Sequence, residues 1–153
     1  MNAIDFLKQE HQNAKEKFQE IEQADARKRG DLWKELKPEL QVHEHIEDEF
    51  LYGPLSEEPK AKGTPLADFQ KRQDEDVAKL EQEISTLERL DAKGLDWLAQ
   101  LRKIKSALEG HIMEEESQIL PAIPKIWDKA KLDQAGRGME EEKQRKLQEA
   151  ATP

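Results

Sequence analysis

Two histidine–glutamate pairs in this sequence have a spacing that could bind metal ions. His43 precedes Glu47 by four positions, and His111 precedes Glu115 by four positions. An α-helix turns by about 100° per residue, so residues four apart share a face, one turn apart along the axis. Imidazole nitrogens and carboxylate oxygens together suit iron, manganese or zinc. Each pair could therefore supply two ligands from a single helix.

The alternative without a metal is that each pair is an exposed ion pair on a helix surface, which is the common case for this spacing. The surrounding sequence argues against it, because both pairs share a helical face with apolar residues. These neighbours are Leu36, Leu40, Ile46 and Phe50 for the first pair, and Ile104 and Leu108 for the second. A third histidine, His11, lies among Leu7, Ala14 and Phe18. His45 falls about 200° from His43 around the helix axis and should face solvent.

Glutamates that point into an apolar core need a partner. Burying an ionised carboxylate costs several kcal/mol even after relaxation. A bound cation between the carboxylates and the histidines removes this cost. Helical bundles commonly hold two carboxylate-bridged metal ions in this way. One ligand from each remaining helix, added to the two pairs, would give six ligands, enough for two metals with open positions.

Four long amphipathic segments would position these side chains. Apolar residues recur at helical spacing in segments from about Ala3 to Gln23, Leu32 to Tyr52, Leu66 to Leu90, and Leu95 to Leu120. Gly30 and Asp31 indicate a helix stop and a new N-cap, and Pro38 should kink or restart the second helix. The pattern predicts an all-α protein, an up-down-up-down four-helix bundle over residues 1–130. Residues 131–153 are predicted to form a short C-terminal helical tail, either a peripheral helix or a frayed end.

The two halves of the chain resemble each other. A shift of 68 positions places the fourth segment on the second, so that His111 meets His43 and Glu115 meets Glu47. A shift of 63 positions places the third segment on the first, so that Asp74 meets His11. The repeat therefore makes Asp74 a candidate ligand from the third helix.

The composition excludes several other classes of protein. The chain has 153 residues, of which 39% are charged, and its formal net charge of −9 argues against nucleic-acid binding. It has no cysteine, which excludes disulfides and thiolate metal sites. No apolar run approaches the ~20 residues of a membrane span, and the polar N-terminus shows no signal peptide. We therefore expect a cytoplasmic protein, a monomer or weak homo-oligomer, without a membrane or nucleic-acid partner.

Four stretches of the sequence resemble a hemerythrin-like protein with the His-His-Glu (HHE) cation-binding motif. They are "FLKQEHQNAKEKF", "LQVHEHIEDEFLYGPL", "LEGHIMEEESQILPAI" and the ending "LDQAGRGMEEEKQRKL". The resemblance implies a non-haem centre of two iron ions, bridged by an oxo or hydroxo group and by carboxylates. It also implies that a small ligand such as dioxygen, peroxide or nitric oxide reacts there, or that the protein senses iron. By position, the ligands would be His11, His43, Glu47, His111 and Glu115.

The third helix departs from the family pattern, which places one or two histidines there. Gln70 and Asp74 stand at the equivalent positions, and we take Asp74 as the sixth ligand, with Glu75 and Gln73 as alternatives. A ligand set with fewer imidazoles favours the ferric state and weakens reversible oxygen binding. Such a site should resemble the carboxylate-rich diiron oxidases, or hold only one metal firmly. Glu44 could add a labile carboxylate, whereas Tyr52 is expected to be a packing residue.

Three functions remain open from the sequence. The first is a redox-active diiron protein that consumes or senses dioxygen, peroxide or nitric oxide. The second is an iron- or oxygen-binding module, sensor or store without turnover. The third is a helical scaffold that has lost its metal. Peroxide consumption by the iron-loaded protein would separate the first from the other two.

Overall fold

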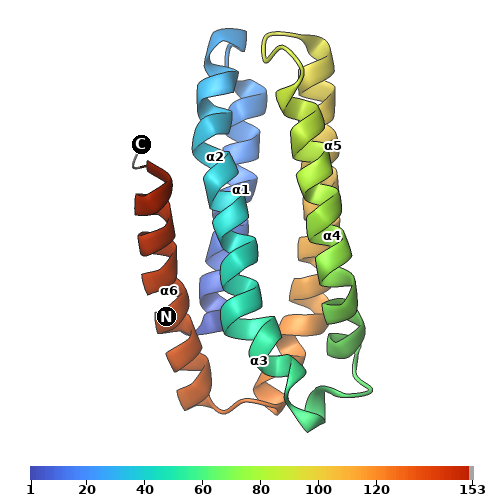
Figure 1. The fold of residues 1–153 in the computed structure, drawn as a ribbon, viewed down its shortest axis with the longest axis vertical. Helices are drawn as coiled ribbons and strands as arrows, with labels where there is room; N and C mark the ends of the chain where they lie inside the picture. The colour runs from blue at the N-terminus through green and yellow to red at the C-terminus, as the bar shows by residue number, and fades with distance from the viewer. Residues whose placement is uncertain (152–153) are drawn as a thin grey trace.

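The chain folds as a bundle of four long helices with a fifth helix on its outside (Figure 1). The computed structural model describes residues 1–151, and no strand occurs among them. The long helices are α1 (Ala3–Gln23), α2 (Ala26–Glu47), α4 (Pro65–Glu88) and α5 (Leu95–Glu114). A short helix α3 (Gly53–Ser56) and a 3₁₀ turn η2 (Pro59–Ala61) join α2 to α4. The predicted all-α, up-down-up-down bundle is confirmed.

The helix boundaries agree with the sequence for α1 and differ for α2. Asn2 caps α1, since its side-chain oxygen accepts a hydrogen bond from the backbone N–H of Asp5 at 2.9 Å. The predicted break at Gly30 and Asp31 is wrong, because α2 begins at Ala26 and runs through both residues. A side chain at position 30 would meet Ala92 at 3.5 Å, so a small residue suits the approach of α2 to the α4–α5 connection. The helix also continues through Pro38 without restarting.

Both helices that carry a His-x3-Glu pair change to π-helical turns beside the glutamate. The first turn, η1 (Asp48–Tyr52), starts directly after Glu47, and the second, η3 (Glu115–Ile119), starts at Glu115 itself. A 3₁₀ segment η4 (Leu120–Lys125) follows η3. Single π-helical turns are rare and are found frequently at functional sites. Here they occur at equivalent places in the two halves of the repeat.

The apolar core has two parts, with the polar candidate residues between them. One cluster, near the α3 end of the bundle, includes Leu7, Ile46, Leu51, Phe69 and Ile119. The other, towards the α4–α5 connection, includes Phe18, Leu36, Leu40, Leu101 and Ile104. Aliphatic and aromatic side chains pack closely on both sides of this layer. The bundle thus encloses a polar layer within an apolar interior.

The C-terminal segment forms α6 (Lys129–Ala151), which packs on α1 and α2 (Figure 1). It starts at Lys129, two residues before the predicted tail of residues 131–153, and it is peripheral with one buried face. The buried residues of that face are Leu132, Ala135, Gly136, Met139 and Glu142. A side chain at Gly136 would overlap the backbone of Met1 and Asn2, so glycine allows α6 to approach the N-terminus. The domain boundary between residues 130 and 131 stays a prediction, and residues 152–153 of the predicted tail lie outside the described part of the chain.

None of the helices within residues 1–151 combines the length and apolar character needed to cross a membrane.

Candidate metal centre

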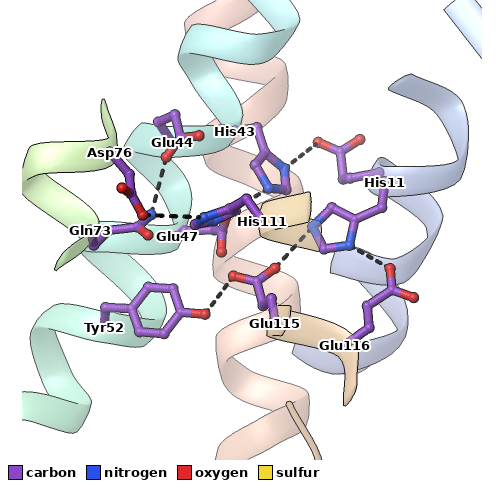
Figure 2. A network of polar contacts seen from close by, with 11 residues as sticks. His11, His43, Glu44, Glu47, Tyr52, Gln73, Asp76, His111, Glu115 and Glu116 are labelled. Carbon is purple, nitrogen blue, oxygen red and sulfur yellow. Dashed lines mark hydrogen bonds and ion pairs between the residues drawn. The ribbon is translucent and has the colours of Figure 1, made fainter. Parts of the chain in front are cut away.

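Four of the predicted ligands converge in the polar layer of the bundle (Figure 2). His11 comes from α1, His43 and Glu47 from α2, and Glu115 from the start of η3. One ligand atom from each of the four lies within 4.8 Å of the others. The Nε2 atom of His11 lies 3.0 Å from Oε1 of Glu115, and Nε2 of His43 lies 2.6 Å from Oε1 of Glu47. Both glutamates are completely buried.

Several of these inward atoms lack hydrogen bonds. Among the described residues, the buried side-chain atoms without a hydrogen-bond partner include both carboxylate oxygens of Glu47, Oε1 of Glu115, and Nε2 of His11 and His111. The atoms are close together but not aligned for hydrogen bonding, and a buried polar atom left unsatisfied costs about 1–3 kcal/mol. Ligand atoms directed at a shared cation have this arrangement. The residues therefore fit a metal ion, and their mixed imidazole and carboxylate donors fit iron.

A carboxylate faces the outer ring nitrogen of each inward histidine. The Nδ1 atom of His11 lies 2.7 Å from Glu116, that of His111 lies 3.6 Å from Asp76, and that of His43 lies 3.9 Å from Glu10. Metal-binding histidines commonly donate their second N–H to a carboxylate, which fixes the tautomer and the ring orientation. Of the three, His11 is at hydrogen-bond distance from its carboxylate, whereas His43 and His111 face theirs at ion-pair distance.

The contact to Glu10 extends to the fifth helix. The Nζ atom of Lys143, on α6, lies 2.5 Å from the Oε2 atom of Glu10. Burial opposes the negative charge of Glu10, but its bonds to His43 and Lys143 lower its pKa below the ordinary value. The C-terminal helix therefore supports one side of the site through Glu10 and His43.

The two buried glutamates have opposite protonation tendencies. Burial and the charge of Glu115 raise the pKa of Glu47 well above its ordinary value. Burial also opposes the charge of Glu115, yet the nearby Glu47 carboxyl group and the imidazoles of His11 and His43 lower its pKa. Burial opposes the charged form of His43, but the charge of Glu47 and the nearby Glu10 carboxylate raise the pKa of this imidazole. Without a cation, the two carboxyl groups must share one proton.

Tyr52 was expected to be a packing residue, and it also touches the candidate site. Its side chain is completely buried, and its ring lies 5.3 Å from that of Phe69. Its hydroxyl donates a 2.5 Å hydrogen bond to the Oε2 atom of Glu115 (Figure 2). Tyr52 thus fixes the carboxylate orientation from the α3 end. Its position in η1, one π-helical turn after Glu47, could not be deduced from regular helical periodicity.

The family comparison agrees with this geometry. Residues 2–123 match the hemerythrin HHE cation binding domain. The chain belongs to this family. The structure is also similar to the crystal structure of a hemerythrin HHE cation binding domain-containing protein from Mycobacterium kansasii. That likeness has a TM-score of 0.84 and 26% sequence identity, and it covers 99% of this chain and 90% of the other. The comparison with curated proteins found no match.

The HHE domain match ends at residue 123, before α6 begins at Lys129. The M. kansasii structure nevertheless aligns with almost the whole of this chain. The outer helix is therefore part of the shared fold of these two HHE proteins, although it lies beyond the matched domain.

His111, the fifth predicted ligand, lies at the edge of the cluster. Its Nε2 atom is buried without a hydrogen-bond partner, and its ring lies 5.0 Å from that of Phe69. It is not among the four residues whose ligand atoms lie within 4.8 Å of one another. His45 is exposed, as expected, and its Nε2 atom lies 2.8 Å from Glu49 on the surface.

On α4 the structure does not bring Asp74 into the HHE site, because Asp74 is exposed to solvent. Its neighbour Gln73, one of the alternatives from the sequence, occupies the inward position with 4% exposure. The Nε2 atom of Gln73 donates to Oε2 of Glu44 at 3.1 Å, and its Oε1 atom is buried without a partner among the described residues. Burial raises the pKa of Glu44. The α4 side of the site is therefore built from Gln73 and Glu44, with no histidine.

Proposed function

We propose that this HHE protein binds two iron ions in the core of the bundle and that the centre reacts with dioxygen, peroxide or nitric oxide. The observation that supports this most is the set of buried carboxylate and imidazole atoms that are close together but not hydrogen-bonded. A buried acid pair without a compensating cation would destabilise the bundle.

We assign the ligands as the residues that would hold the two ions, His11, His43, Glu47, His111 and Glu115. Imidazole and carboxylate donors of this kind are typical of iron centres in helical bundles. Bound iron would supply one-electron chemistry and open positions for a small molecule. Asp74 is not assigned, since its side chain is exposed.

The surrounding residues would keep this centre in shape. Glu116, Asp76 and Glu10 hold the outer nitrogen of each histidine, and Tyr52 holds Glu115. Partners of this kind maintain ligand orientation and basicity. The apolar clusters on both sides of the site would limit its contact with solvent along the bundle axis.

The lack of an α4 histidine favours consumption of an oxidant over reversible oxygen carriage. Three inward imidazoles and two inward carboxylates make a harder ligand set than one in which α4 adds histidines. Hard, anionic ligands stabilise the ferric state, in which dioxygen is not bound reversibly. On the α4 side of the site, the hydrogen-bonded pair of Gln73 and Glu44 takes the place of a histidine.

Iron content, absorption spectrum and peroxide consumption of the purified protein test the proposal together. We expect about two iron atoms per chain, a ferric charge-transfer spectrum and loss of added hydrogen peroxide. Iron binding without any reaction would favour the binding module or sensor. Protein that takes up no iron and gains no stability from it would leave only the scaffold.

A further inference from the structure

Two hollows of different size reach the candidate centre. The first is a narrow space of about 40 Å³ whose walls include Phe18, Leu36, Leu40 and Leu108. The second is a groove of about 420 Å³ between α4 and α5. Its walls carry charged groups, among them Arg72, Asp76 and Glu114, and the first hollow also borders charged side chains such as Glu10 and Lys105. His111 and Glu44 line both hollows, so each hollow leads to the same side chains.

The groove is open because α5 carries small residues where it faces α4. Ser106, Ala107 and Gly110 form part of its wall. A methyl group added at Gly110 would meet no atom within 4 Å, so this position borders open space. The opening is therefore a property of the α5 sequence, and position 110 has room for a β-carbon.

The groove leads to atoms of the candidate centre. The outer nitrogen of His111 lies 3.6 Å from the Asp76 carboxylate, and both residues line the groove. The side chain of His111 is 17% exposed, whereas its Nε2 atom is buried without a hydrogen-bond partner. Behind it, Glu44 is held by Gln73. A molecule in the groove would thus touch the one candidate ligand that lies at the edge of the cluster.

We propose that the α4–α5 groove is the route by which hydrogen peroxide reaches the centre. This inference rests on the proposed function and names the polar reactant and its path. Hydrogen peroxide both donates and accepts hydrogen bonds, and moving such a molecule from water into an apolar space costs several kcal/mol. The groove is about tenfold larger than the first hollow, so a hydrated peroxide molecule fits it, and Arg72 and Asp76 offer hydrogen-bond partners there.

The test compares Gly110→Leu, which fills the groove, with Gly110→Ala, which removes the glycine but leaves the groove open. Both variants replace a helical glycine and should fold, because the position has free space. Iron content and resting spectrum should match the wild type in both. In stopped-flow mixing with hydrogen peroxide, we expect Gly110→Leu to slow the spectral change at least about tenfold and Gly110→Ala to leave it unchanged. Equal rates in the two variants would overturn the proposed route.

A second measurement is independent of iron. Diethyl pyrocarbonate modifies accessible neutral imidazoles, and mass spectrometry of the metal-free protein locates the modified residue. We expect Gly110→Leu to protect His111 relative to the wild type and Gly110→Ala, with exposed His45 modified equally in all three. If His111 is modified equally in Gly110→Leu and the wild type, the proposed route is wrong, whatever the rates measured with iron. Iron-loaded wild type that leaves peroxide unchanged would overturn the proposed function instead.

Discussion

Glu116 holds the Nδ1 atom of His11 at 2.7 Å, although the two residues are 105 positions apart in the chain. The bond joins α1 to η3 and presents the other nitrogen of the ring to Glu115. The same arrangement, with a carboxylate outside and Nε2 inside, holds for His43 and His111. An imidazole held in this way is preorganised for a metal, because its tautomer and ring orientation are already set.

The first prediction concerns the histidines. His43→Ala and His111→Ala should each reduce iron content from about two atoms per chain to about one or fewer, because each removes an inward donor. His45→Ala is the matched control, since its imidazole lies on the outer side of the same helix as His43. Elemental analysis after expression with iron measures this. An equal loss of iron from His45→Ala would contradict the conclusion that His43 points into the bundle and His45 points outward.

The second prediction separates Gln73 from Asp74. Gln73→His should alter the ferric absorption spectrum, because it places an imidazole at the inward position of α4. Asp74→His should leave the spectrum unchanged, because Asp74 is exposed. The two variants introduce the same side chain at neighbouring positions, so they differ only in whether the new imidazole points into the bundle or into solvent. A change from Asp74→His alone would show that α4 is rotated relative to the structure.

The position of Gln73 shows what the sequence could and could not provide. Leu66, Gln73, Leu80 and Leu87 form a row at seven-residue spacing, and all four are buried. This row indicates the inward face of α4, and Gln73 stands in it. The repeat instead pointed to Asp74, one residue away and about 100° around the helix. The repeat aligns chain positions, but it does not fix the rotation of a helix, which packing determines.

The third prediction concerns pH. Above pH 4.5, the ordinary pKa of a glutamate, folded metal-free protein keeps a proton on Glu47 that the unfolded chain releases. His43 has the same effect above pH 6.5, because its pKa is also raised on folding. Folded protein then binds more protons than unfolded protein, so its free energy of unfolding falls as pH rises. One such proton contributes a slope of at most about −1.4 kcal/mol per pH unit.

Urea unfolding of the metal-free protein between about pH 5 and pH 8 tests this slope. Glu47→Gln should flatten the dependence, because a neutral amide exchanges no proton. Iron affinity should change in the opposite direction and increase with pH, since binding requires a deprotonated Glu47 and a neutral His43. A metal-free wild type that becomes more stable from pH 5 to pH 8 would contradict the assigned proton sharing.

The fourth prediction concerns the fifth helix. Lys143→Met removes the ammonium that lies 2.5 Å from Glu10 and keeps a side chain of similar length. Glu10 would then hold His43 less firmly, and we expect iron affinity to fall about tenfold, the lower end for losses of outer-shell partners. Lys146→Met is the control, since Lys146 is paired with Glu149 on the same helix and not with the site. Iron competition with a chelator gives the affinities.

The extent of the candidate site was also only partly accessible from the sequence. The paired spacing of His43 with Glu47 and of His111 with Glu115 gave the inward glutamates. The sequence did not identify the partners Glu10, Glu116 and Lys143, because charged residues on a helix are usually exposed to solvent. Their roles depend on contacts between distant helices, such as the 133 positions between Lys143 and Glu10. Only the folded arrangement identifies them.

The π-helical turns η1 and η3 set a limit on how this protein can be redesigned. Each accommodates about one residue more than a regular turn, and every later side chain on that segment is rotated by about 100° as a result. Deleting one residue of η1 ahead of Tyr52 would swing its phenol away from Glu115 and put Gly53 in its place. A scaffold built from ideal straight helices could copy both His-x3-Glu pairs and still misplace the side chains that follow them in the sequence, including Tyr52.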